Sequence, residues 1–304
     1  MKSAGKPRVV ALVLNYNGKA ITLETVASLL AMTYGELVVA VIDNGSSDGS
    51  PEAVAAAFPG VEQVLVAVNE GPAAGVNAGL RWALARDFDY VLVLNNDIEV
   101  APDMLDRLVE VAESDETIGC VGPKCLYYGN RDVLWSAGGR VRFGESVTRE
   151  RGMGERDAGQ FDRTEDVDYV NGCAMLMRRR VPEKIGLWDP QYFLSVEDAD
   201  WCLRMRRAGY RCVYAHRAVL WHMVSETVGN YVPARTFHTG RSTALFVRRY
   251  ASPLQWLRFA ALLALAIPAA YLRELPKGNQ AAAVAKLRGV WAGLRAPIAP
   301  PPRL

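Results

Sequence analysis

Asn95, Asn96 and Asp97 directly follow a short apolar run at residues 90–94. The run is rich in Val and Leu and too short for a helix, so it predicts a buried strand. Open α/β sheets bind ligands at the carboxyl ends of their strands, and a carboxylate beside amide oxygens suits Mg²⁺ or Mn²⁺ carrying a diphosphate. The alternative is a strand-to-helix turn in which Asp97 or Asp103 caps the following helix. This stretch alone leaves both interpretations open.

A second group of acids, Glu197, Asp198 and Asp200, stands at the start of an expected helix. The positive end of the helix dipole stabilises carboxylates there, so capping is one interpretation. The other is general-base catalysis, which needs a carboxylate held beside a hydroxyl group. Glu197 and Asp200 are three residues apart and are expected on one helix face, with Asp198 on another, so the acids should not share one role.

His222 directly follows a short strand expected at residues 219–221. One interpretation is a packed residue at a strand end. The other is a metal ligand that joins Asp97 in a site with mixed oxygen and imidazole donors.

The five cysteines form no C-x-x-C pair, and Cys173 and Cys202 lie in apolar runs. Such a pattern is typical of buried thiols. It predicts a reducing compartment and neither a disulfide framework nor a zinc site.

The elements that must position these residues begin with four short apolar strands, expected at residues 9–14, 37–42, 61–68 and 90–94. Helical patterns separate the strands, which predicts a parallel sheet with right-handed crossovers and hence an α/β fold. Each strand is followed closely by a polar residue, and these are Asn15, Asp43, Asn69 and Asn95. Because the carboxyl ends of parallel strands meet at one sheet edge, these residues predict a nucleotide site. No G-x-G-x-x-G fingerprint of dinucleotide-binding folds is present.

The charge of the chain is divided unevenly along its 304 residues. Residues 235–304 hold eleven Lys and Arg and one acid, a balance of +10, whereas the first 234 residues hold 24 basic and 32 acidic residues, a balance of −8. This asymmetry predicts an anionic surface that the tail meets, and nothing in the sequence indicates nucleic-acid binding.

Three further stretches of the sequence predict a mobile loop, membrane contact and an unfolded end. The charged segment 149–168 is expected to be a mobile loop serving as a lid or as a wall on the acceptor side. The clean apolar run in the tail, residues 259–272, is about fourteen residues long, and a bilayer span needs about twenty. We therefore expect tail helices lying in the membrane interface, or else packed on the domain or in a homodimer. Residues 297–302 are expected to be an unfolded end.

The motifs taken together resemble the family 2 inverting glycosyltransferases, and among them the bacterial rhamnosyltransferase-like enzymes of surface polysaccharide synthesis. The resemblance runs in order over about residues 8–225 and is carried by the stretches 13–18, 41–50, 69–79, 94–97, 171–179, 186–189, 193–200 and 221–222. It implies a GT-A type, Rossmann-like sheet with helices on both faces over residues 1–234, followed by a helical extension over residues 235–304.

The resemblance also implies roles for individual residues. Asp198 matches the catalytic base, with Glu197 as its charged neighbour or a contact to the acceptor. Asp97 and His222 match the ligands of Mg²⁺ or Mn²⁺. The residues implied to bind the nucleotide sugar are Asn15, Asn17, Asp43, Asn69, Asn77, Arg81, Asn95 and Asn96. Asn95 departs from the family's D-x-D motif, because an acid often stands there.

The implied activity is transfer of a sugar from a nucleoside diphosphate sugar to a glycan or lipid-linked acceptor by a single inverting displacement. dTDP-rhamnose is the first expectation for the donor, with UDP- and GDP-sugars as alternatives. The expected location is cytoplasmic, at the inner face of the cell membrane. The sequence leaves two other functions open, a metal-dependent nucleotidyltransferase and a non-catalytic, membrane-bound carbohydrate-binding module.

Overall fold

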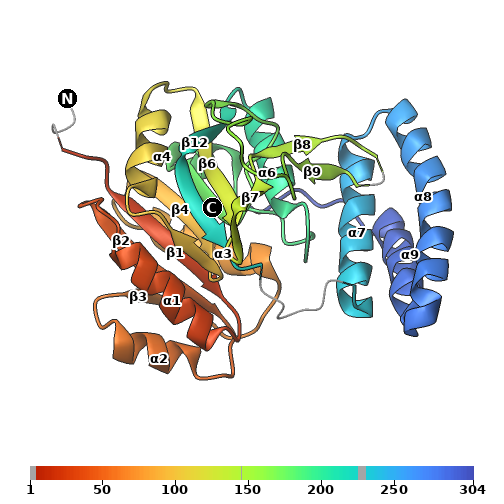
Figure 1. The fold of residues 1–304 in the computed structure, drawn as a ribbon, viewed down its shortest axis with the longest axis horizontal. Helices are drawn as coiled ribbons and strands as arrows, with labels where there is room; N and C mark the ends of the chain where they lie inside the picture. Colours follow the sequence, from red (N-terminus) through yellow and green to blue (C-terminus); the bar gives the residue numbers. More distant parts are fainter. Residues whose placement is uncertain (1–4, 145, 225–230) are drawn as a thin grey trace.

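A computed structural model describes residues 5–144, 146–224 and 231–304 of the chain. Its first half is a parallel sheet in the order β3-β2-β1-β4, with helices in the crossovers (Figure 1). The elements are β1 (Val9–Asn15), α1 (Lys19–Leu30), β2 (Leu37–Asn44), α2 (Ser50–Ala57), β3 (Glu62–Val66), α3 (Pro72–Leu84) and β4 (Tyr90–Asn95). The expected α/β fold class, with four parallel strands joined by helices, is confirmed.

The two faces of the sheet have separate cores, as the alternation of side chains along β1 illustrates. Val10 and Leu12 pack with Val76 and Leu80 of α3. The residues between them pack on the other face with side chains of α1 and of α4 (Met104–Glu113). Because both faces of β1 are covered, the strand is a continuous apolar run, as buried parallel strands require.

The second half of the chain extends the same sheet with mixed strands. These are β5 (Ile98–Val100), β6 (Ile118–Tyr127), β7 (Asn130–Ser136), β10 (Glu165–Asp166), β11 (Ala174–Arg178) and β12 (Arg211–His222). Strand β11 lies antiparallel between β4 and β6, and β12 runs parallel to β6. A separate hairpin pairs β8 (Gly139–Val141) with β9 (Thr148–Glu150), and the helices are α5 (Arg180–Ile185) and α6 (Glu197–Arg207).

The segment at residues 149–168 is anchored, which contradicts the expected mobile loop. Lys124, only 5% exposed, donates from Nζ to the carboxylates of Asp157 and Asp162. Burying a lysine ammonium is costly unless it is paired, so these two contacts fix the segment on β6.

Three helices form the C-terminal part: α7 (Pro233–Tyr250), α8 (Pro253–Glu274) and α9 (Gln280–Arg295), with the short helix η1 (Leu275–Lys277) after α8. Helices α7 and α9 touch backbone to backbone, since a Cβ atom added to Gly289 would lie 2.0 Å from the carbonyl oxygen of Phe237. Helix α7 is attached to the sheet domain by Arg249, whose Nη1 lies 2.5 Å from Asp189 and 3.3 Å from Asp200. Helix α7 therefore packs on the domain, and α9 packs on α7.

The last residues are also held, which corrects the expected unfolded end at residues 297–302. The carbonyl oxygen of Pro302 accepts a hydrogen bond from the backbone of Leu187 at 2.9 Å. The carbonyl oxygen of Ala299 accepts one from Arg249 Nη2 at 2.8 Å. Proline prevents a helix here, but backbone carbonyls still offer hydrogen-bond acceptors to the domain.

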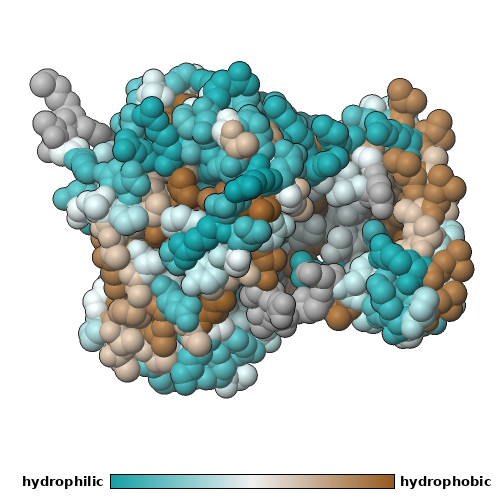
Figure 2. Space-filling model, viewed as in Figure 1, coloured by the Kyte–Doolittle hydropathy of each residue, from teal (hydrophilic) through white to brown (hydrophobic). Residues whose placement is uncertain are grey.

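Helix α8 is longer than the expected apolar run of fourteen residues. It has 22 residues because Ser252 starts it with a capping box, Pro253 occupies its first turn, and Pro268 does not end it. By length and composition the stretch Pro253–Lys277 could cross a membrane, with a mean hydropathy of 1.4 and 6% of its apolar window buried. Most of its length is not packed against the protein, and Figure 2 shows a hydrophobic surface along it.

Candidate active site

A cavity of about 550 Å³ opens where the carboxyl ends of the sheet meet α6 and the C-terminal helices. Its walls include Asn95 at the end of β4, His222 at the end of β12, and Glu197 and Asp198 at the start of α6. Helices α7 and α9 add Thr239 and Lys286, among other residues. The helical extension therefore forms part of the site.

Asp97 and His222 lie side by side because β5 pairs with the end of β12, with Ile98 opposite His222. His222 Nε2 lies 3.1 Å from Asp97 Oδ1, and both residues are less than 10% exposed. Asp97 does not begin a helix, since β5 follows it directly, so its interpretation as a helix cap is wrong. Asp103, the other candidate, does occupy the N-cap position of α4, although its side chain makes no capping hydrogen bond.

These two side chains fit a divalent metal. Two neighbouring ligands of an octahedral ion with bonds of about 2.1 Å lie about 3 Å apart, close to the separation found here. A carboxylate oxygen and an imidazole nitrogen are donors that Mn²⁺ accepts. His222 Nδ1 is buried and has no hydrogen-bond partner among the described residues, and the edge of Trp135 packs on the ring with centroids 4.3 Å apart. Packing by Trp135 thus orients the ring.

The catalytic candidates Glu197 and Asp198 are presented by a strained backbone. Ser195 and Val196, directly before α6, have φ values of +76° and +64°. Such values are rare for a β-branched residue and often mark functional sites. Asp198 Oδ2 accepts a hydrogen bond from the Gly172 backbone at 2.9 Å, and Oδ1 accepts one from Ala199 at 2.7 Å. The Asp198 carboxylate is therefore held in one orientation.

The expected grouping of the three acids on α6 is wrong. Glu197 and Asp198 both line the cavity, whereas Asp200 is fully buried on the side of α7. Asp200 accepts from Tyr250 at 2.7 Å and pairs with Arg204 at 2.9 Å, so it joins α6 to α7. Neighbouring residues of a helix point only about 100° apart, so Glu197 and Asp198 can both face the cavity while Asp200 faces α7.

Burial shifts the protonation of both cavity acids. It raises the pKa of Asp198 to about 7, with a further contribution from the negative charge of Glu150. Burial and the neighbouring Asp198 carboxylate raise the pKa of Glu197 to about 8. Glu197 Oε2 has no hydrogen-bond partner among the described residues. The two carboxyl groups therefore titrate as a pair, and near neutral pH the pair retains a proton.

Glu150, at the end of β9, is a cavity residue that the sequence did not single out. Its carboxylate accepts hydrogen bonds from Tyr169 Oη at 2.5 Å, from Asn171 Nδ2 at 3.0 Å and from Ser136. It lies in the segment expected to be mobile, and no motif distinguishes it from the other acids there. The segment was expected to form a lid or a wall on the acceptor side, and Glu150 does line the cavity.

The residues expected to bind the nucleoside form a hydrogen-bonded network beyond the cavity. Asn15 is fully buried and donates to Asp43 Oδ1 at 2.8 Å, while its Oδ1 accepts from Asn96 at 3.0 Å. Asn17 Oδ1 accepts from the Ser47 backbone at 2.8 Å. The structure thus brings these residues together at the ends of β1, β2 and β4.

The other expected donor-binding residues are dispersed. Asn69 Oδ1 accepts from the Gly71 backbone at 2.8 Å and shapes the start of α3. Asn77 is buried and makes two hydrogen bonds to the backbone of Trp188, at 2.8 and 2.9 Å, which fixes a cavity residue. Arg81 is exposed in the last turn of α3 and is not in the cavity wall.

The chain is similar to known proteins over most of its length. The sequence model of the family described as "Glycosyltransferase like family 2" matches residues 7–238. The N-acetylglucosaminyl-diphospho-decaprenol L-rhamnosyltransferase of Mycobacterium tuberculosis is 26% identical over 256 residues, covering 76% of this chain and 82% of the relative. The poly-beta-1,6-N-acetyl-D-glucosamine synthase of Staphylococcus aureus is 24% identical over 250 residues, covering 80% of this chain and 57% of the relative.

Solved structures show the same fold. The mannosyltransferase PcManGT from Pyrobaculum calidifontis, in complex with GDP-Man and Mn²⁺, superposes with a TM-score of 0.59 at 19% identity, over 96% of this chain and 88% of that one. GalNAc-T7 with UDP, GalNAc and Mn²⁺ gives a TM-score of 0.61 at 15% identity, over 83% and 54% of the two chains. These likenesses confirm the GT-A type of sheet.

Proposed function

Because the chain belongs to the glycosyltransferase like family 2, we propose that it is an inverting glycosyltransferase that moves a sugar from a nucleoside diphosphate sugar to a lipid-linked glycan acceptor. The observation that carries the proposal is the Asp198 carboxylate, fixed by two backbone N–H groups in a cavity that also contains His222. A fixed, partly desolvated carboxylate with a raised pKa is suited to take a proton from a hydroxyl group.

In this proposal Asp198 removes the proton of the acceptor hydroxyl as its oxygen attacks the anomeric carbon of the donor. Attack from the face opposite the leaving diphosphate inverts that carbon in one step, so no covalent sugar–enzyme intermediate is needed. Glu197, protonated at neutral pH, donates a hydrogen bond to the acceptor and adds no competing negative charge. Lys286, in the cavity wall, offsets the charge of the diphosphate.

Asp97 and His222 would hold a divalent metal, Mn²⁺ or Mg²⁺, through Oδ1 and Nε2. When bound, such an ion offsets the negative charge that develops on the leaving diphosphate. With Asn95 in place of an acid, one negative charge fewer faces the ion than in a D-x-D motif.

dTDP-L-rhamnose is the proposed donor, supported by the similarity to the mycobacterial rhamnosyltransferase. The experiment incubates the enzyme with dTDP-, UDP- and GDP-sugars, Mn²⁺ and a polyprenyl diphosphate-linked N-acetylglucosamine acceptor. Release of dTDP, together with a product whose anomeric configuration is opposite to that of the donor, is the expected result. Pyrophosphate turnover would indicate a nucleotidyltransferase instead, and absence of turnover with every donor would leave only a binding role.

We further propose that α8 lies on the inner face of the cell membrane. Leu254, Leu257, Leu265 and Leu272 are between 64% and 76% exposed. Their spacing of 3, 8 and 7 residues places them on one side of the helix. Together with the basic tail, this apolar stripe (the four leucines) matches the composition of helices that lie in an anionic membrane interface.

Sedimentation with anionic vesicles tests the membrane proposal. Leu265→Glu should weaken binding at least about 10-fold, since a charged residue at a membrane-buried position is costly. Leu65→Glu is the matched control, because Leu65 is 66% exposed on β3, far from α8 (Figure 1). Equal binding of the two variants, or concentration-dependent dimerisation lost only in Leu265→Glu, would show that α8 faces another copy of the chain.

A further inference from the structure

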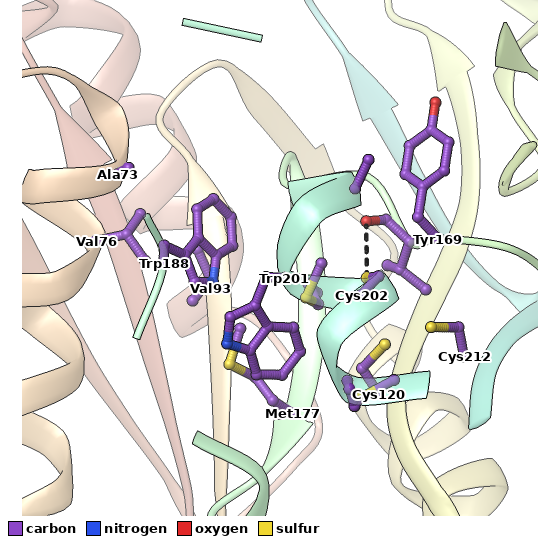
Figure 3. Close-up of a cluster of buried hydrophobic side chains, with 14 of the residues drawn as sticks. Ala73, Val76, Val93, Cys120, Tyr169, Met177, Trp188, Trp201, Cys202 and Cys212 are labelled. Carbon is purple, nitrogen blue, oxygen red and sulfur yellow. Dashed lines mark hydrogen bonds between the residues drawn. The ribbon is translucent and has the colours of Figure 1, made fainter. Parts of the chain in front are cut away.

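Three buried cysteines from β6, α6 and β12 lie close together in the core. Cys120 is on β6, Cys212 is its direct partner on β12, and Cys202 reaches them from α6 (Figure 3). The three Sγ atoms all lie within 4.8 Å of one another, and each residue is at most 1% exposed. Among the described residues this is the one group of three or more His, Cys, Asp or Glu side chains close enough to share an ion.

A second cavity, of about 630 Å³, reaches this cluster. Cys212 forms part of its wall, together with Arg206, Arg207 and Arg211. The Arg206 guanidinium donates to Asp168 at 3.0 Å and contributes positive charge beside the Cys212 sulfur. The cluster is therefore buried but next to a solvent-accessible space whose wall also holds Asp166 and Asp168, paired with Arg211 and Arg206.

We propose that Cys120, Cys202 and Cys212 form a site for one thiophilic divalent cation of the Zn²⁺ class, with water from the second cavity as the fourth ligand. Tetrahedral Zn²⁺ with Zn–S bonds of about 2.3 Å separates its sulfur ligands by about 3.8 Å, within the limit found here. On binding, three S–H bonds break, three protons leave to solvent and three metal–sulfur bonds form. The remaining charge of −1 would lie beside the ion pair of Arg206 with Asp168.

The site is chemically distinct from the Asp97–His222 pair. Thiolates favour soft ions such as Zn²⁺, whereas carboxylates favour Mg²⁺ and Mn²⁺. Cys202 stands four residues after Asp198 on α6, so the two lie on one face of the helix, a turn apart. A cation bound to all three sulfurs would tie α6 to β6 and β12 and so hold the Asp198 carboxylate in place.

The test uses the full-length protein, stripped with a chelator and titrated with Cd²⁺, whose thiolate complexes absorb in the near ultraviolet. We expect this band to saturate at one ion per chain, and Zn²⁺ to abolish it by competition. Each variant Cys120→Ala, Cys202→Ala or Cys212→Ala should weaken binding by at least about 100-fold, because each removes one of the three sulfur ligands. Zn²⁺ should raise the melting temperature of the wild type by roughly 5 °C.

The matched control is the double variant Cys125→Ala, Cys173→Ala. Its two thiols are equally buried, with sulfurs 3.7 Å apart, but have no third cysteine nearby. It should bind Cd²⁺ as the wild type does. X-ray absorption of the Zn²⁺-loaded wild type should count three sulfur ligands at about 2.3 Å, which keeps the test valid even if a variant fails to fold. Absence of the charge-transfer band, a sulfur count below three, or loss of binding only in the control would overturn the proposal.

Discussion

Replacing Asp198 by Asn should abolish most of the transfer activity. The amide oxygen can still accept the hydrogen bond from Gly172, now made at 2.9 Å, although the one from Ala199 loses its acceptor. It has no ionisable group to take the acceptor proton, and the loss of a general base costs about 10²–10⁴-fold in rate. At about 1.36 kcal/mol per tenfold, this raises the activation free energy by about 2.7–5.4 kcal/mol.

The assay is the initial rate of nucleoside diphosphate release, with donor affinity measured separately by calorimetry. We expect kcat to fall in Asp198→Asn while the dissociation constant of the donor stays nearly unchanged, because the base acts on the acceptor. Glu197→Gln is the matched comparison. The pKa of Glu197, raised to about 8, keeps it protonated at pH 7, and Gln imitates that state, so the effect should be below about 10-fold.

The pH profile tests the same assignment. Asp198 must be ionised to act as a base, and burial raises its pKa to about 7, so activity should rise tenfold per pH unit below this value and level off above it. Glu150→Gln removes one negative charge that contributes to the raised pKa and should move the rise to lower pH. Near-normal turnover in Asp198→Asn, or a larger loss in Glu197→Gln, would refute the assignment of the base.

Three further predictions concern the surroundings of the reaction. Asp97→Asn and His222→Ala should each raise the Mn²⁺ concentration for half-maximal activity at least about 10-fold in a metal titration, and no change would remove that residue from the metal site. Asn77→Ala should lower the free energy of unfolding by about 2–4 kcal/mol in urea, because two backbone groups of Trp188 lose their buried partners; an unchanged midpoint would contradict this. Arg249→Met should cost about 3–5 kcal/mol by the same measurement, since it leaves buried Asp189 without an ion-pair partner among the described residues and Asp200 with Arg204 alone; a neutral result would show that solvent reaches the Asp189 carboxylate.

The sequence predicted the first half of the fold well because each β-strand there carries its own signal. A strand buried on both faces is a short apolar run. Strands β1, β2 and β4 each end in a polar residue, which marks where the strand stops. The pairing of Asp97 with His222 was also within reach, because both stand at strand ends and carry metal-binding groups. The chemistry of the candidate site was thus partly visible in local patterns.

Contacts between segments that are distant in the sequence could not be predicted from local patterns. Glu150 resembles every other acid of a charged segment until Tyr169 and Asn171 are placed against it. The three clustered cysteines have no recognisable spacing, since only the pairing of β6 with β12 and the packing of α6 bring them together. The length of α8 was underestimated because only the uncharged run from residue 259 was counted, whereas the helix begins at Pro253 and includes Arg258.

The C-terminal helices complete the cavity although they are the last part of the chain to be synthesised. Chains emerge from the ribosome with the N-terminus first, and their N-terminal parts fold first. Asp198 and the sheet are complete before α9 has been translated, yet Lys286 of α9 forms part of the cavity wall and Pro302 holds the Leu187 backbone. A prematurely terminated chain would therefore carry Glu197 and Asp198 in a site that lacks part of its wall. We expect such fragments to be inactive in transfer, because the cavity wall is incomplete until α9 has been made.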